Sequence, residues 1–251
     1  MHTFVTKERS GFPMHIAEGF LPVTHCVAWA AASTPFVVYG ANRVRTQLKE
    51  HPETGLLLGA AGAFSFVLSA IKIPSVTGSS SHPTGTGLGA VLFKPPVMAF
   101  MGSIVLLFQA LLLAHGGITT LGANIFSMAI IGPYAGYGIF LLSRKLGSGF
   151  DVAVFAAAFI ADLSTYVMTA LQLSLAHHGA GIGNAFATFL ALYAPTQLPL
   201  AIIEALITVM IFRSLRVIAD KELKVLGFIF TPHTPEKAVD PKITTSTTKG
   251  V

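Results

Sequence analysis

Residues 88–113 read LGAVLFKPPVMAFMGSIVLLFQALLL, and this apolar run decides how often the chain crosses a membrane. It exceeds the ~20 residues that a helix needs to span the hydrocarbon core of a bilayer. Lys94, Pro95 and Pro96 interrupt it, and consecutive prolines remove two backbone donors and clash with the preceding turn. We therefore expect a break here, with a short segment before the prolines and a full-length helix after them.

Other apolar runs near the length of a membrane helix flank this stretch, at 23–40, 56–73, 118–142, 152–176 and 185–212. The chain is 53% hydrophobic and 11% charged, a balance typical of an integral membrane protein. Its net charge of +5 comes mainly from clustered Lys and Arg, which fits a membrane protein's cytoplasmic loops better than nucleic-acid binding. The single cysteine, Cys26, excludes an internal disulfide.

The charged loops indicate how the chain is oriented, because cytoplasmic loops of membrane proteins are rich in Lys and Arg. Such residues follow the first run, the fourth run and the last run: Arg43, Arg45, Lys49, Arg144, Lys145, Arg213, Arg216, Lys221 and Lys224. The loops at 74–87 and 177–184 contain no Lys, Arg, Asp or Glu, so we expect them outside.

An odd number of crossings must then separate the outer loop from the inner loop at Arg144, and the break at Lys94 supplies the extra one. We predict an all-α, polytopic membrane helical bundle of about seven transmembrane helices, with the N-terminus outside and the C-terminus in the cytoplasm. We divide the chain into an N-terminal extension at 1–13 that is not in the mature protein, a membrane-embedded domain at 14–224 and a disordered tail at 225–251.

Met14 and His15 are the strongest candidates for metal chemistry. In a chain that begins at Met14, the free amine, the His15 amide nitrogen and the His15 Nδ1 form two fused rings around one cation. Nitrogen ligands favour Ni²⁺, Cu²⁺ or Co²⁺ over Mg²⁺ and Ca²⁺, and three nearly coplanar nitrogens leave one in-plane position.

The loop SSSHPTGTG at 79–87 carries a histidine, His82, that can fill this position, because the predicted topology places it on the same outer face. Ser80 and Ser81 are candidates for orienting the rings. Taken alone, the loop is equally compatible with a solvated turn. Asn124 is a candidate for a hydrogen bond to a loop or helix end near the site, although an ordinary interhelical hydrogen bond is an equal alternative.

Asp162 and Glu204 lie within apolar runs, where ionisable groups are costly and often functional. They form either the proton relay of a self-powered permease or hydrogen-bonded groups that tie helices together, and we favour the second interpretation. We interpret His115, His177 and His178 as interfacial residues. The chain has neither a phosphate-binding P-loop nor a nucleophile elbow, so we expect no ATP binding and no enzyme activity.

The segment MHIAEGFLP at 14–22 and the loop at 79–87 closely resemble the CbiM/NikM family, the substrate-capture membrane components of energy-coupling-factor importers for cobalt and nickel. Residues 122–133 and 161–166 also resemble this family, over a region from Met14 to about Arg216. The resemblance implies four metal ligands: the Met14 amine, the amide nitrogen and imidazole of His15, and the His82 imidazole. It also implies a seven-helix fold and three kinds of partner: a transmembrane coupling protein, two ATPase subunits and a small accessory membrane protein.

Family members begin at the methionine that matches Met14, so we interpret residues 1–13 as the product of a start assigned too far upstream. Met1 and His2 offer the same chelating pair at the extended terminus. We expect a subunit of the bacterial cell inner membrane that captures Co²⁺ at the outer face for ATP-driven import. The alternatives are a nickel-specific homologue binding Ni²⁺, a stand-alone proton-coupled permease, and an interaction protein without a metal.

Overall fold

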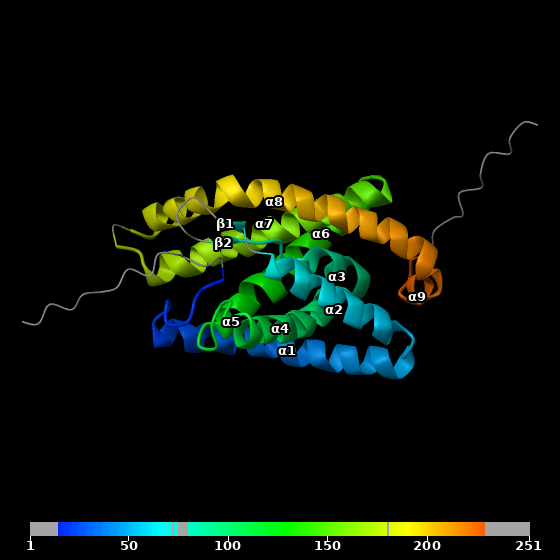
Figure 1. The fold of residues 1–251 in the computed structure, drawn as a ribbon, viewed down its shortest axis with the longest axis horizontal. Helices are drawn as coiled ribbons and strands as arrows, with labels where there is room; N and C mark the ends of the chain where they lie inside the picture. Colours follow the sequence, from blue (N-terminus) through cyan, green and yellow to red (C-terminus); the bar gives the residue numbers. More distant parts are fainter. Residues whose placement is uncertain (1–14, 72, 75–79, 180, 229–251) are drawn as a thin grey trace, which may run out of the picture.

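The computed structural model describes residues 15–71, 73–74, 80–179 and 181–228. They form a bundle whose long helices run along its long dimension (Figure 1). The helices are α1 (Val23–Glu50), α2 (Thr54–Ala70), α3 (Thr86–Phe93), α4 (Pro95–Leu112), α5 (Leu121–Asn124), the π-helix η1 (Ile125–Ile131), α6 (Gly132–Lys145), α7 (Phe150–Ala176), α8 (Ile182–Ile218) and α9 (Asp220–Val225). Within the described residues, β1 (Ile73–Pro74) and β2 (Ser80–Ser81) pair as a short antiparallel ladder. The predicted all-α class is therefore confirmed.

Within the described ranges, four helical stretches are long and apolar enough to cross a membrane: α4, the continuous stretch from α5 to α6, α7 and α8. Helix α2 is equally apolar in character but shorter. These helices identify a multi-pass membrane protein. The count of seven crossings stays a prediction.

The predicted break at the double proline is confirmed. Helix α3 ends at Phe93 and α4 begins at Pro95, and Lys94 between them has φ 70° and ψ 157°. Prolines fit the first positions of a helix, where the backbone N–H has no helical partner, but they exclude helical geometry from the preceding residue. The sequence therefore ends one helix and starts the next within three residues.

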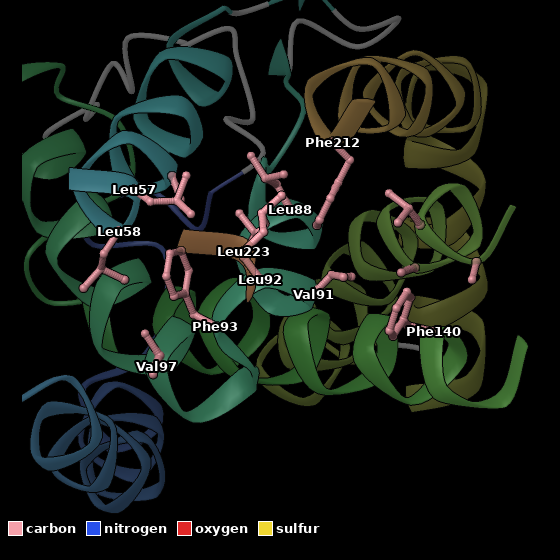
Figure 2. Packing of buried hydrophobic residues seen from close by; sticks show 14 of the residues in the cluster. Leu57, Leu58, Leu88, Val91, Leu92, Phe93, Val97, Phe140, Phe212 and Leu223 are labelled. Carbon is pink, nitrogen blue, oxygen red and sulfur yellow. The ribbon is translucent and has the colours of Figure 1, made fainter. Parts of the chain in front are cut away.

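Helix α3 lies at the centre of the largest apolar cluster (Figure 2). All eight of its residues are buried, and Val91, Leu92 and Phe93 pack with Phe140 of α6 and Phe212 of α8. This packing fixes the position of a helix too short to span a bilayer, and with it the loop that precedes the helix.

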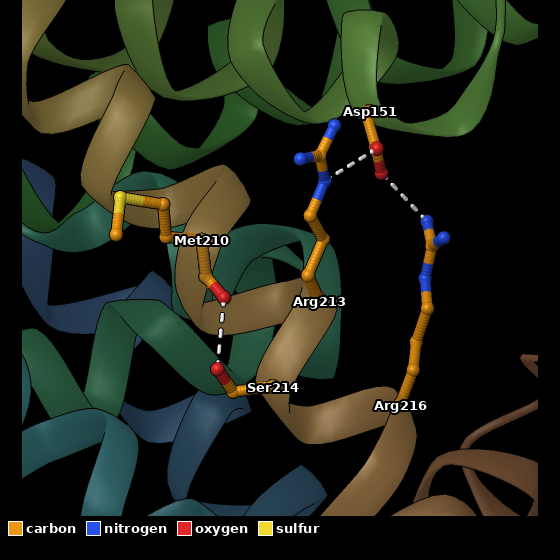
Figure 3. Close-up of polar contacts among 5 residues, drawn as sticks. All are labelled: Asp151, Met210, Arg213, Ser214 and Arg216. Carbon is orange, nitrogen blue, oxygen red and sulfur yellow. Dashed lines mark hydrogen bonds and ion pairs between the residues drawn. The ribbon is translucent and has the colours of Figure 1, made fainter.

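The two ends of the bundle differ in chemistry. At the start of α7, Asp151 accepts hydrogen bonds from Arg213 at 2.9 Å and from Arg216 at 2.8 Å (Figure 3). Beyond the other end of α7, the Nε2 of His177 donates to the carbonyl oxygen of Phe20 at 2.8 Å. We call the end at the start of α7 the basic end, defined by Arg144, Arg213 and Arg216. We call the opposite end the histidine end, defined by His15, His82 and His115.

Replacing Phe212 with alanine tests the contribution of this core. The ring is fully buried, so Phe212→Ala leaves a cavity, and we expect a loss of about 3 kcal/mol in the free energy of unfolding. Ile203→Ala, at a position 49% exposed on the same helix, is the control and should have a far smaller effect. Thermal unfolding of the detergent-solubilised protein measures both variants. Equal decreases in melting temperature would contradict the assignment of Phe212 to the stabilising core.

Candidate metal site

In the described part of the chain, three buried histidines meet at the histidine end: His15 before α1, His82 before α3 and His115 before α5. Each offers a ring nitrogen, and these nitrogens all lie within 4.8 Å of one another. The interpretation of His115 as an interfacial residue is therefore wrong, because only 2% of its surface is exposed. His115 lies in the loop after α4, and the centroid of its ring is 4.4 Å from that of the His15 ring.

A chain of hydrogen bonds sets the tautomer of His15. The hydroxyl of Ser69 donates to the carbonyl oxygen of Ser65 at 2.6 Å, so its oxygen is left to accept a bond from the Nε2 of Gln109. The amide oxygen of Gln109 then faces the Nε2 of His15 at 2.9 Å. Because this oxygen can only accept, Nε2 carries the hydrogen, and the Nδ1 of a neutral His15 presents a lone pair.

His82 is arranged in the complementary way. Its Nδ1 lies 3.0 Å from the carbonyl oxygen of Pro83, so this nitrogen donates, and the Nε2 of a neutral ring carries the lone pair. Nε2 lies 3.1 Å from the Nδ1 of His15. When both rings are neutral, two lone pairs face each other, an arrangement that one proton or one metal ion stabilises.

This spacing suits neighbouring ligands of one ion. Metal–imidazole bonds of ~2.0 Å at a right angle place two ligand nitrogens ~2.8 Å apart. The observed 3.1 Å between the His15 and His82 nitrogens requires only a small contraction. The arrangement of these nitrogens could hold a borderline transition-metal ion, the class that imidazole nitrogen favours.

The segment that carries His15 is tied down through the backbone of Ile16. Asn124 accepts from the Ile16 N–H at 2.9 Å and donates to its carbonyl oxygen at 3.1 Å, while Thr120 donates to the same oxygen at 2.6 Å. The side chain of Ile16 is buried against Tyr166 and its neighbours. Asn124 therefore lies beside the site and binds the segment that carries His15.

Glu18 holds the same segment to the loop that follows His115. Thr119 donates its hydroxyl to Glu18 Oε1 at 2.5 Å and its N–H to Oε2 at 3.1 Å. These bonds stabilise the carboxylate and hold the pKa of Glu18 below its ordinary value. Because the folded-state pKa is lowered, this contribution to stability is present above the ordinary pKa and is lost as the pH falls through the lowered one.

The backbone of the His82 loop is held by Tyr166 of α7 and Glu204 of α8. Tyr166 donates its hydroxyl to the His82 carbonyl oxygen at 2.7 Å. The buried Glu204 accepts the N–H groups of Thr84 at 2.6 Å and Gly85 at 2.9 Å. Gly85 has φ 67°, and an added Cβ would lie 2.7 Å from the Cα of Ser65, so the turn requires glycine.

Asp162 lies beside Glu204 and would repel it if both were ionised. It accepts a hydrogen bond from Gln197 at 2.5 Å. The two carboxyl groups therefore link α7, α8 and the His82 loop, which favours the interpretation that they tie the bundle together. These roles depend on contacts between residues 35 to 120 positions apart, and no spacing in the sequence indicates them.

Several predicted residues need separate mention. Met14 lies outside the described residues, and the side chains of Ser80 and Ser81 are also outside them, although their backbone forms β2. His178 is exposed at the histidine end, as expected for an interfacial residue. The roles of Met14, His15, His82 and Asn124 in metal binding stay predictions. One sequence signal does point to this neighbourhood, because Gln109 is an amide inside the apolar stretch VLLFQALLL.

Comparison with known sequences gives one family, CbiM, described as "Cobalt uptake substrate-specific transmembrane region", which matches residues 15–222. A cobalt transport protein CbiM of Streptomyces coelicolor is 58% identical over 220 residues, which cover 87% of this chain and 95% of that protein. A protein of the same name from Propionibacterium freudenreichii is 58% identical over 216 residues, covering 85% and 92%. A crystal structure of a truncated transition metal transporter superposes with a TM-score of 0.71 at 27% identity, covering 80% of this chain and 97% of that one.

Replacing Gln109 tests the hydrogen-bond chain to His15. Gln109→Leu removes the acceptor that sets the tautomer, and we expect the affinity for Co²⁺ to fall 10- to 100-fold, the usual cost of losing such a partner. Gln47→Leu makes the same chemical change at the basic end and should leave the affinity unchanged. Isothermal titration calorimetry measures the Co²⁺ affinity of both variants. A Gln109→Leu protein that is folded and binds Co²⁺ normally would rule out a role of Gln109 in preparing His15 for the metal.

Replacing Glu204 tests the support of the His82 loop. Gln in place of Glu204 keeps one acceptor oxygen but sets an NH₂ group against a backbone N–H, so we expect a roughly tenfold loss of Co²⁺ affinity. The control is Glu50→Gln, at an exposed glutamate outside the site. Unchanged binding by a folded Glu204→Gln protein would show that the loop keeps its position without this carboxylate.

Proposed function

Because the chain belongs to the CbiM family of cobalt-uptake transmembrane proteins, we propose that it is the substrate-capture component of an ATP-driven energy-coupling-factor importer, with Co²⁺ as the cargo. The family is one of transport proteins rather than enzymes. The observation that carries the proposal is the pair of imidazole nitrogens 3.1 Å apart at the histidine end.

In this proposal Co²⁺ enters a square of four nitrogens. Two are the His15 Nδ1 and the His82 Nε2, whose outer nitrogens are each bonded to an acceptor. The other two are the Met14 amine and the His15 amide nitrogen. The ring of His115, with its centroid 4.4 Å from that of His15 and 4.8 Å from that of His82, contacts the ion outside this square. Ser80 and Ser81 orient the His82 loop, and Asn124 fixes the backbone next to His15.

The amine ligand requires a mature chain that begins at Met14. We therefore propose that residues 1–13 are absent from the mature protein, that 14–224 form the membrane-embedded domain and that 225–251 form a cytoplasmic tail. The histidine end then faces outward, so the N-terminus is outside. The basic end faces the cytoplasm of a bacterial cell inner membrane, as the excess of arginine there favours.

Release into the cell requires energy that this chain does not supply in the proposal. We assign that role to a transmembrane coupling protein, two ATPase subunits and a small accessory membrane protein. A nickel-specific importer of the same class is the alternative, because four nitrogen ligands accept either ion and often bind Ni²⁺ more tightly than Co²⁺. A stand-alone permease that uses Asp162 and Glu204 is less favoured, because both carboxylates already serve as hydrogen-bond acceptors between structural elements.

Native mass spectrometry of the chain expressed from its own gene and loaded with Co²⁺ tests the capture site. We expect one ion bound to a chain that begins at Met14, and its loss in His15→Ala and in His82→Ala. His178→Ala, which removes an exposed histidine at the same end, is the control and should retain the ion. Competition with Ni²⁺ in the same samples decides between the two metals. Full affinity in both the His15 and the His82 variants would overturn the proposal.

A further inference from the structure

A cavity of about 610 Å³ opens at the basic end, at the opposite end of the bundle from the histidines. It lies between α3, α6, α7 and α8 and the residues that follow α9. Cations from three separate segments converge on it: Lys94 from the break between α3 and α4, Arg144 from α6 and Arg216 from α8. The capture of a metal cation uses none of these groups.

The charge of this cavity is not balanced by its own lining. Among the described residues that line it, none is Asp or Glu. Asp151 lies nearby and binds Arg216 at 2.8 Å, but it also binds Arg213 at 2.9 Å, so a second arginine shares that carboxylate. Figure 3 shows both guanidinium groups directed at the one carboxylate. Among the described residues, positive charges therefore predominate at this cavity.

Two of the cations are held in place by an aromatic ring. The guanidinium carbon of Arg216 lies 4.4 Å from the centroid of Phe150, and that of Arg144 lies 5.9 Å from it. Such contacts restrain a long side chain without consuming its hydrogen bonds. Arg144 uses one N–H on the carbonyl oxygen of Ser148, and a guanidinium group has five N–H donors.

Lys94 reaches the cavity through an unfavourable backbone conformation. Its φ of 70° lies in a region that a residue with a side chain rarely adopts, and the prolines that follow enforce the break. The break places an exposed cation directly after the buried helix α3. Strained residues of this kind concentrate at binding sites.

We propose that this cavity binds a phosphate group, carried either by an anionic phospholipid or by a soluble phosphate ester. Guanidinium groups match phosphate oxygens with paired hydrogen bonds, and an ammonium group adds a point charge. Basic pockets between membrane helices at the cytoplasmic side bind acidic lipid headgroups in the same way. Tyr137, Phe140 and Phe228 supply an aromatic wall for the apolar part of such a ligand. The site goes beyond metal capture and does not depend on it.

Native mass spectrometry of the full chain in detergent, with phosphatidylglycerol, cardiolipin or phosphatidylethanolamine added, tests the site. We expect the two anionic lipids to remain bound at least fivefold more than phosphatidylethanolamine. Lys94→Gln and Arg144→Gln should each remove most of this preference. Lys145→Gln is the matched control, because it removes one exposed positive charge next to Arg144 from a residue that does not line the cavity.

Inorganic phosphate and glycerol 3-phosphate, added to the lipid-loaded protein, distinguish the two sources of phosphate. Displacement of the bound lipid at millimolar concentration of these anions supports a soluble phosphate ester as the ligand. Retention of the lipid supports a phospholipid as the ligand. Equal losses in Arg144→Gln and Lys145→Gln would overturn the proposal, since only overall charge would then matter. Binding of none of these anions would also overturn it and would leave acidic side chains of a partner protein as the counter-charge. Co²⁺ binding, measured on the same variants, should be unchanged, so failure of this site and failure of metal capture give different results.

Discussion

A polar group inside a membrane protein must find its hydrogen-bond partner within the protein, because the hydrocarbon offers none. The histidine end of this bundle contains irregular backbone at Ile16 and at residues 82–85, and side chains from other elements satisfy it. Glu204 accepts the N–H groups of Thr84 and Gly85, and Asn124 pairs with both polar backbone atoms of Ile16. The positions of His15 and His82, which adjoin these backbone segments, depend on these bonds.

The same requirement sets the chemistry of the candidate ligands. An imidazole has two nitrogens, and a metal can use only one that carries no hydrogen. Here the outer nitrogen of each ring is committed to an oxygen acceptor, of Gln109 for His15 and of Pro83 for His82. The remaining nitrogens are thereby directed at each other. Specific orientation of this kind lowers the cost of binding, since the rings are already placed before an ion arrives.

Charge is separated between the two ends of the molecule. Imidazole and amide groups are concentrated at the histidine end, whereas Arg144 and Arg216 lie over the ring of Phe150 at the basic end. Helix α3 and its apolar neighbours fill the space between these two ends. An apolar core therefore separates the candidate metal site from the cavity at the basic end.

The sequence by itself determined the features that depend on neighbouring residues. The apolar runs predicted a membrane bundle, the double proline predicted the break after Phe93, and two short motifs singled out His15 and His82. Only the tertiary structure decided that His115 and Gln109 lie beside these histidines and that Glu204 holds the loop before α3. These contacts join residues from different helices and loops, up to 120 positions apart in the chain. Helix packing brings them together, and packing depends on the shapes of all the contacting side chains, which no local pattern encodes.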